Sequence, residues 1–188
     1  MRLCCIDIDG VIANRDARLA LARSVYLMKC DRDGKEPEPQ VYNRGFDWDT
    51  FQDPSNVYLD TLILGVNDAL NILIDQGYIL VFLSSRSEHM YADTLEWFAL
   101  YVFIRQSCPI VLKDAENRYT KTATWKAQQV VRFVEMYQPS EVLCIDDRED
   151  NLQAIVQVLT VPFQLHTSLA AALEASQDKA MRWLAGER

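Results

Sequence analysis

Residues 3–10 read Leu-Cys-Cys-Ile-Asp-Ile-Asp-Gly, an apolar run that ends in two acids and a glycine. The apolar part is nearly continuous rather than alternating, which is typical of a strand buried on both faces of a parallel sheet. Asp7 and Asp9 stand where this strand ends, and ligands of such sheets bind outside the carboxyl ends of the strands. The stretch therefore predicts a central strand and a polar site beside it.

Four further apolar runs predict four more strands, over residues 78–83, 109–113, 142–145 and 161–165. Stretches with apolar residues at helical spacing predict helices over residues 66–76, 91–101, 122–137, 151–159 and 168–184. Ser168 is suited to cap the last of these. Strands that alternate with helices predict an α/β fold, with a parallel sheet covered by helices on both faces.

Residues 15–62 interrupt this alternation. A helix is predicted from Arg15 to Cys30, and residues 31–60 then hold three of the six prolines and two of the six glycines without a clear period. We expect one domain over residues 1–188, with residues 15–62 as a small insertion after the first strand.

Composition narrows the function classes. The 188 residues carry a net charge of −8, which argues against a surface that coats nucleic acid but leaves room for a local basic pocket. No apolar run approaches the roughly 18–20 residues of a membrane span, and an acid stands within the first seven residues, so we expect a cytoplasmic protein. The five cysteines form no Cys-x-x-Cys pair, which favours free thiols over a disulfide framework or a zinc site.

Polar side chains follow three of the predicted strands. They are Asp7, Asp9, Ser84, Ser85, Arg86, Asp146 and Asp147. Because the carboxyl ends of parallel strands meet at one edge, we expect these side chains to converge. Clustered carboxylates raise one another's pKa, and a cation relieves the repulsion. Carboxylate oxygens suit Mg²⁺, so the sequence predicts a magnesium site.

Residues 113–132 are locally basic. They hold five basic and two acidic residues, a net +3 in a chain of −8. Lys126 lies near the start of the predicted helix 122–137, where its ammonium could balance the carboxylates. Tyr119 and Trp125 could stack on a base, or Trp125 could be half-buried on an ordinary solvated helix.

Four segments in this order resemble the haloacid dehalogenase-like superfamily of phosphotransferases. They are Ile6-Asp7-Ile8-Asp9-Gly10, Val81-Phe82-Leu83-Ser84, Lys126 (with Lys121 as the alternative) and Leu143-Cys144-Ile145-Asp146-Asp147. The resemblance implies a Rossmann-like parallel sheet flanked by helices, with a small cap inserted after the first strand.

Within that superfamily the chain is similar to the 3′-phosphatase domain of phage-type polynucleotide kinase/phosphatases. The similarity rests on Ser84-Ser85-Arg86, on Thr94-Leu95-Glu96-Trp97 and on Asp146-Asp147-Arg148. Ser85 replaces the usual Gly of that domain, and Val11 replaces the common Thr. The sequence has no Gly-x-x-x-x-Gly-Lys-Ser/Thr loop, so no kinase domain is expected in this chain. Asp-x-Asp-Gly-Val with a later Asp-Asp is also similar to small deoxyribonucleotidases.

The resemblance implies a mechanism. Asp7 would attack phosphorus and form an aspartyl-phosphate, and Asp9 would protonate the leaving group and then activate water. We expect neighbouring carboxylates to raise the pKa of Asp9 toward neutrality for these tasks. Ser84, Arg86 and Lys126 would bind and neutralise the phosphoryl oxygens.

The resemblance also implies ligands and substrate contacts. The Mg²⁺ ligands would be Asp7, Asp9 (through its backbone carbonyl), Asp146 and Asp147. Gly10, Ser85, Lys121 and Arg148 would contact the substrate. That substrate would be a phosphorylated DNA or RNA 3′ end, or alternatively a nucleotide; a phosphate-binding module without catalysis is the third reading.

Overall fold

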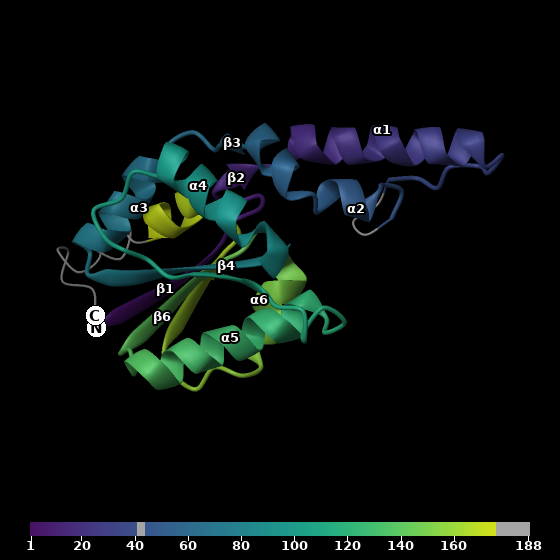
Figure 1. The fold of residues 1–188 in the computed structure, drawn as a ribbon. Helices are drawn as coiled ribbons and strands as arrows, with labels where there is room; N and C mark the ends of the chain where they lie inside the picture. The colour runs from purple at the N-terminus through teal and green to yellow at the C-terminus, as the bar shows by residue number, and fades with distance from the viewer. Residues whose placement is uncertain (41–43, 176–188) are drawn as a thin grey trace.

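The structure, a computed structural model, describes residues 1–40 and 44–175. A parallel sheet of five strands in the order β5-β4-β1-β6-β7 lies at its centre (Figure 1). The strands are β1 (Arg2–Asp7), β4 (Tyr78–Ser87), β5 (Ile110–Lys113), β6 (Glu141–Ile145) and β7 (Phe163–His166). This topology confirms the predicted parallel α/β fold and makes β1 the middle strand.

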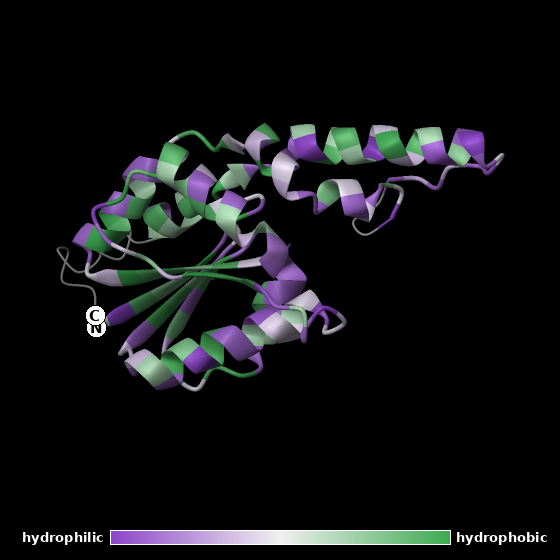
Figure 2. Cartoon of the chain, in the orientation of Figure 1, coloured by the Kyte–Doolittle hydropathy of each residue, from purple (hydrophilic) through white to green (hydrophobic). Residues whose placement is uncertain are grey.

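Helices cover both faces of the sheet. α3 (Val66–Asp75) and α4 (Tyr91–Tyr101) pack on one face, where Cys4 and Ile6 of β1 join their apolar cluster. α5 (Thr122–Tyr137) and α6 (Glu149–Val156) pack on the opposite face. Leu3 and Cys5 of β1 belong to that second cluster. Alternate residues of β1 thus enter two cores, which explains its unbroken apolar sequence (Figure 2).

The predicted last helix, 168–184, is described only in part. Residues 169–175 are helical, and Leu169 and Ala172 join the apolar cluster of the α3 face. Residues 176–184 lie outside the described residues.

The insertion after β1 forms an arm (Figure 1). Its helix α1 (Asp16–Arg32) is two residues longer at its end than the predicted helix, and the short helix α2 (Trp48–Phe51) packs against it. A 3-10 helix, η1 (Pro54–Leu59), leads back to the body. The short strands β2 (Ala13–Asn14) and β3 (Thr61–Leu62) pair antiparallel at its base, so the insertion that we predicted over residues 15–62 leaves and rejoins the body at this pair.

β4 is longer than predicted. Its pairing with β5 shifts register between Ser84 and Ser87, so the strand continues through residues expected to follow it. This irregularity carries Ser84 and Arg86 past the end of β1 as buried side chains. The five cysteines are free thiols, as the sequence indicates. In the described part of the chain, no helix combines the length and apolar character that crossing a membrane requires.

Candidate active site

A buried lysine joins the acids at the ends of β1 and β6. Lys126 Nζ lies 2.9 Å from Asp7 Oδ1 and 2.5 Å from Asp146 Oδ2, and only 2% of the lysine is exposed. Lys126 reaches this edge from the first turns of α5. Lys121, the alternative, is exposed at the start of that helix. The structure therefore brings Lys126, and not Lys121, to the carboxylates.

Three carboxylates of this edge can share a cation. One oxygen each of Asp7, Asp146 and Asp147 lie within 4.8 Å of one another. Asp147 Oδ1 is buried and has no hydrogen-bond partner among residues 1–40 and 44–175. Burying an unpaired charged oxygen is costly, so this atom is suited to a ligand. Three carboxylates fit Mg²⁺, whereas the side chain of Asp9 lies outside this group.

Hydrogen bonds fix the orientation of Asp146. Its Oδ1 accepts from Asn151 Nδ2 at 2.9 Å and from the backbone N–H of Arg148 at 3.0 Å. Its Oδ2 faces Lys126. The side chain of Arg148 forms an ion pair with Asp150, and its backbone N–H contacts the site at Asp146.

Gly10 allows Asp147 to approach β1. Its φ is +94°, and a Cβ atom built there would lie 2.3 Å from Asp147 Oδ2. A side chain at this position would therefore be strained by the backbone and would also displace a proposed metal ligand.

Replacing Gly10 with Ala is expected to cost about 1–2 kcal/mol from the positive φ and at least about 1 kcal/mol more from the contact with Asp147. Gly77→Ala is the matched control, because Gly77 has a φ of +83° and open space around its Cβ position. Urea unfolding of both variants measures the difference. Equal losses in the two variants would show that the approach of Asp147 places no constraint on residue 10.

Burial dominates the ionisation of Asp7. Burial raises the pKa of Asp7, Lys126 lowers it, and Asp146 and Asp9 raise it. The net result is a pKa of about 7. A cation held by the same carboxylates would favour the ionised form. The charge state of Asp7 therefore depends on the charges of the groups around it.

Asp9 faces a different set of charges. Its carboxylate accepts from Arg86 at 2.8 and 3.0 Å and from Arg18 at 2.5 Å. Asp60 joins the same group, at 3.0 Å from Arg18 and 2.7 Å from Arg86. We call these four buried residues, two acids and two arginines, the arginine–aspartate cluster.

The predicted pKa of Asp9 is wrong in direction. Burial raises it, but the guanidinium groups of Arg86 and Arg18 outweigh burial and hold the pKa of Asp9 well below its usual range. Asp7 and Asp9 do not belong to one extended segment. β1 ends at Asp7, and the chain turns, since the Ile8 carbonyl accepts from the N–H groups of Ile12 and Ala13.

Arg18 and Asp60 were not among the predicted site residues. They lie 42 positions apart, in α1 and after η1, so no local motif connects them. The similarity of residues 94–97 to the 3′-phosphatase domain was the one sequence feature that pointed to this cluster. Thr94 Oγ1 accepts from Arg86 at 3.3 Å, and Trp97 Nε1 donates to the Asp60 carbonyl at 2.9 Å.

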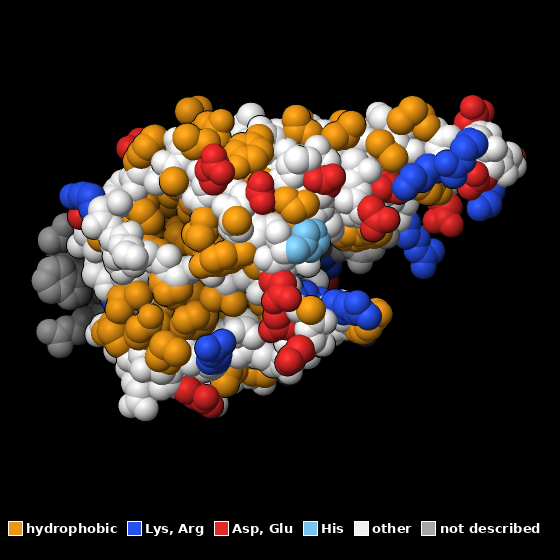
Figure 3. All heavy atoms as spheres, viewed as in Figure 1, with side chains coloured by type: hydrophobic (Ala, Val, Ile, Leu, Met, Phe, Trp, Pro, Cys, Tyr) orange, Lys and Arg blue, Asp and Glu red, His pale blue; other side chains and the backbone are white. Residues whose placement is uncertain are grey.

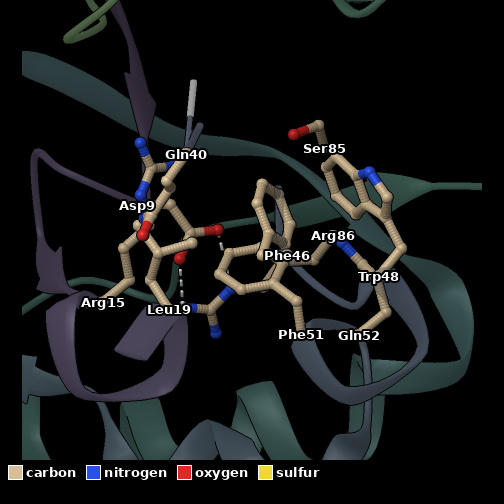
Figure 4. Close-up of a pocket in the computed structure, with 10 residues that line it drawn as sticks. All are labelled: Asp9, Arg15, Leu19, Gln40, Phe46, Trp48, Phe51, Gln52, Ser85 and Arg86. Carbon is tan, nitrogen blue, oxygen red and sulfur yellow. Dashed lines mark hydrogen bonds and ion pairs between the residues drawn. The ribbon is translucent and has the colours of Figure 1, made fainter. Parts of the chain in front are cut away.

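Ser84 and Ser85 lie at the same edge. Ser84 is buried, and its hydroxyl donates to Asp9 Oδ2 at 3.3 Å and accepts from the Arg86 N–H at 3.2 Å. Ser85 lines a cavity of about 210 Å³ that opens beside Asp9. In Figure 4, Asp9 and Arg15 lie on one side of this cavity and Trp48 and Ser85 on the other, with aromatic rings of the insertion between them.

Of the two aromatic residues of the basic segment, Trp125 differs from expectation and Tyr119 does not. Trp125 is 0% exposed, so it neither stacks on a ligand nor is half-buried. Tyr119 is 85% exposed. The ring missed by sequence reasoning is Trp48, which lines the cavity from the insertion.

Comparison with known proteins supports the fold. No protein-family model matches the chain, and no curated protein matches it in sequence. Solved structures match with distant sequences. A chain of the Pnkp1/Rnl/Hen1 RNA repair complex aligns with a TM-score of 0.55 at 18% identity, over 89% of this chain and 42% of that one.

Two further structures align along more of their own length. One is described as a predicted phosphatase from Clostridium acetobutylicum, with a TM-score of 0.57 at 18% identity over 86% of this chain and 82% of the other. The second is a dehalogenase, with a TM-score of 0.51 at 12% identity over 93% and 96%. The chain has the haloacid dehalogenase-like fold, and it spans less than half of the RNA repair chain.

Proposed function

We propose that this chain is a Mg²⁺-dependent phosphomonoesterase with Asp7 as its nucleophile, and that it removes 3′-phosphates from nucleic-acid ends. One observation carries the proposal. Lys126 pairs with Asp7 and Asp146 at the edge where Asp147 keeps a buried oxygen without a partner among the described residues. A nucleophile, a cation for the phosphate and a metal site are thereby adjacent.

Asp7 is oriented for attack. Its Oδ1 accepts from the Ile8 N–H at 2.8 Å and pairs with Lys126. Oδ2 would attack phosphorus, which forms an aspartyl-phosphate and releases the ester oxygen with its bonding electrons. Lys126 would neutralise charge on the phosphoryl oxygens. Asp7, Asp146 and Asp147 would hold Mg²⁺, whose charge would offset the repulsion between carboxylate and phosphate.

Asp9 would handle protons, as the resemblance implies. Its low pKa keeps Asp9 ionised. In the second step the ionised carboxylate would accept a proton from the water that attacks the aspartyl-phosphate and frees Asp7. In the first step Asp9 would give a proton to the leaving oxygen. A phosphate dianion beside Asp9 would raise its pKa by like-charge repulsion, which is the direction that this step requires.

Two observations favour a nucleic-acid end as substrate. One of the similar structures is a chain of an RNA repair complex. The cavity beside Asp9 has an aromatic wall and is open to solvent, so it can admit one end of a longer molecule. Its volume of about 210 Å³ also suits a single nucleotide, which supports a nucleotidase as the second candidate.

A substrate panel tests this proposal. The wild-type protein is assayed for phosphate release from a 3′-phosphorylated oligonucleotide, its 5′-phosphorylated counterpart and nucleoside monophosphates, with Mg²⁺ or with excess chelator. We expect chelation to lower the rate at least about 100-fold, because the three acids then repel the phosphate. The 3′-phosphorylated oligonucleotide should have a kcat/KM at least about tenfold above the others, which corresponds to about 1.4 kcal/mol.

The alternatives give different results. A higher kcat/KM for nucleoside monophosphates would identify a nucleotidase. Release from no phosphate ester, with binding retained, would identify a phosphate-binding module.

A further inference from the structure

A second cavity adjoins the one beside Asp9. It has a volume of about 410 Å³ and shares Trp48, Gln52 and Ser85 with the first cavity. The shared residues make the two cavities one continuous groove, which begins at Asp9 and Arg86. Figure 3 shows a notch in the surface between the α1 arm and the tip of the loop that connects β5 and α5.

The far end of this groove is positively charged. Lys113 and Arg118 line the second cavity, and no carboxylate from residues 1–40 or 44–175 does. Lys113 donates to the carbonyl of Thr120, which holds its ammonium at the start of the loop. The exposed Arg118 guanidinium lies 4.5 Å from the centre of the Tyr119 ring. In a chain of net charge −8, two cations without a lining acid indicate an anionic ligand.

Trp48 stands where the two cavities meet. Its ring packs against Phe46 at 4.7 Å and against Phe51 at 5.7 Å between centroids, the latter edge to face. Even so, 44% of Trp48 is exposed, and the residue lines both cavities. An aromatic ring held in place but accessible is suited to stack on a nucleobase, since every base offers a π face.

We propose that this groove is a track for the last nucleotides of a single strand. The terminal nucleoside lies in the first cavity with its phosphate toward Asp7, and its base stacks on Trp48. The preceding phosphodiester lies on Lys113 and Arg118. We expect an unpaired strand, because cavities of about 210 and 410 Å³ are of a size for single nucleotides and not for base pairs. The inference rests on the proposed 3′-phosphatase function and adds that a nucleic-acid strand is a better substrate than a mononucleotide.

The test compares a single-stranded trinucleotide 3′-phosphate, the same strand annealed to a complement, and a nucleoside 3′-phosphate. We expect the single strand to exceed the other two in kcat/KM by about tenfold or more. Arg118→Gln should reduce this advantage to within about threefold and lower the slope of log affinity against log salt by about 0.7, the value for one phosphate contact in a single strand. Trp48→Ala should weaken strand binding by about tenfold, and Trp48→Phe by less.

Arg132→Gln is the matched control, because Arg132 is an exposed cation of the same basic segment that lines neither cavity. Its ratio of kcat/KM for the trinucleotide 3′-phosphate to kcat/KM for the nucleoside 3′-phosphate should equal that of the wild type. Equal kcat/KM for trinucleotide and mononucleotide would overturn the track, as would equal effects of Arg118→Gln and Arg132→Gln.

Two further measurements separate this inference from the proposed function. Release of phosphate from p-nitrophenyl phosphate reports the phosphatase activity without any strand. Fluorescence anisotropy of the Asp7→Asn variant with labelled trinucleotide and mononucleotide reports the track without any turnover. Turnover with no difference in binding would refute the track alone, and a difference in binding without turnover would refute the phosphatase alone.

Discussion

Replacement of Asp7 by Asn is expected to lower phosphate release at least about 1,000-fold while the fold is retained, a barrier increase of about 4 kcal/mol. A neutral amide does not attack phosphorus. Asn is similar in shape, so its oxygen can still accept from the Ile8 N–H, and Lys126 keeps Asp146 as an ion-pair partner. Initial rates with Mg²⁺ on a 3′-phosphorylated oligonucleotide measure the effect, and urea unfolding checks the fold.

A phosphoenzyme assay makes this test specific. Acid quenching of the wild type with substrate labelled in its phosphate should trap label on the protein, and Asp7→Asn should trap none. Asp75→Asn is the control, because Asp75 is a 60% exposed carboxylate that pairs with Arg105 away from the site. Turnover by Asp7→Asn within about tenfold of wild type, or about 1.4 kcal/mol, would contradict the nucleophile assignment.

The parts of the fold that depend on local sequence were predictable. A strand buried on both faces needs a continuous apolar run, and β1, β4 and β6 have one. Because the sheet is parallel, the residues that end these strands meet at one edge, which is why Asp7 and Asp146 lie close enough to share Lys126 of α5.

The electrostatics of the site depend on contacts between distant segments. Asp9 was expected to interact with other acids because they are its neighbours in the motif. Its carboxylate contacts Arg18 and Arg86 instead, and these contacts lower its pKa where the sequence had predicted a raised one. No periodicity in the predicted helix 15–30 marks Arg18 as a buried residue. Burial of Trp125 likewise depends on how α5 packs, which its spacing alone leaves open.

The groove was also beyond sequence reasoning. The basic segment at residues 113–132 was recognised, but its aromatic partner lies in the insertion. Trp48 belongs to α2, in a stretch without a clear period, and only the folded arm brings it to Ser85. The two segments that line the groove are far apart in the sequence, and only the tertiary structure brings them together.

The arginine–aspartate cluster should be the most costly site in the fold at which to remove one charge. Its two acids and two arginines balance, and the side chains of Arg18, Arg86 and Asp60 are 0% exposed. Burial raises the pKa of Asp60 to about 6, so its carboxylate is ionised at pH 7.5. Asp60→Ala at that pH leaves two buried guanidiniums with one acid. We expect a loss of about 3–5 kcal/mol in the free energy of unfolding, measured with urea.

A second substitution distinguishes charge balance from lost packing. Arg18→Met alone leaves Asp9 and Asp60 to share Arg86, and we expect it to be costly as well. The double variant combines Asp60→Ala with Arg18→Met. It keeps one acid and one arginine, Asp9 and Arg86, which are joined by two hydrogen bonds. Because neutrality is restored, the double variant should be more stable than the sum of the single losses predicts, by about 2 kcal/mol.

Asp75→Ala provides the comparison for an exposed ion pair. Asp75 and Arg105 are 60% and 66% exposed, so solvent screens their attraction, and the loss should stay below about 1 kcal/mol. If Asp60→Ala cost no more than Asp75→Ala, the cluster would not hold the insertion to the site. Additive losses in the double variant would mean that each residue acts by packing alone. A positive coupling therefore requires that α1 and the end of η1 stabilise Asp9 through buried charge.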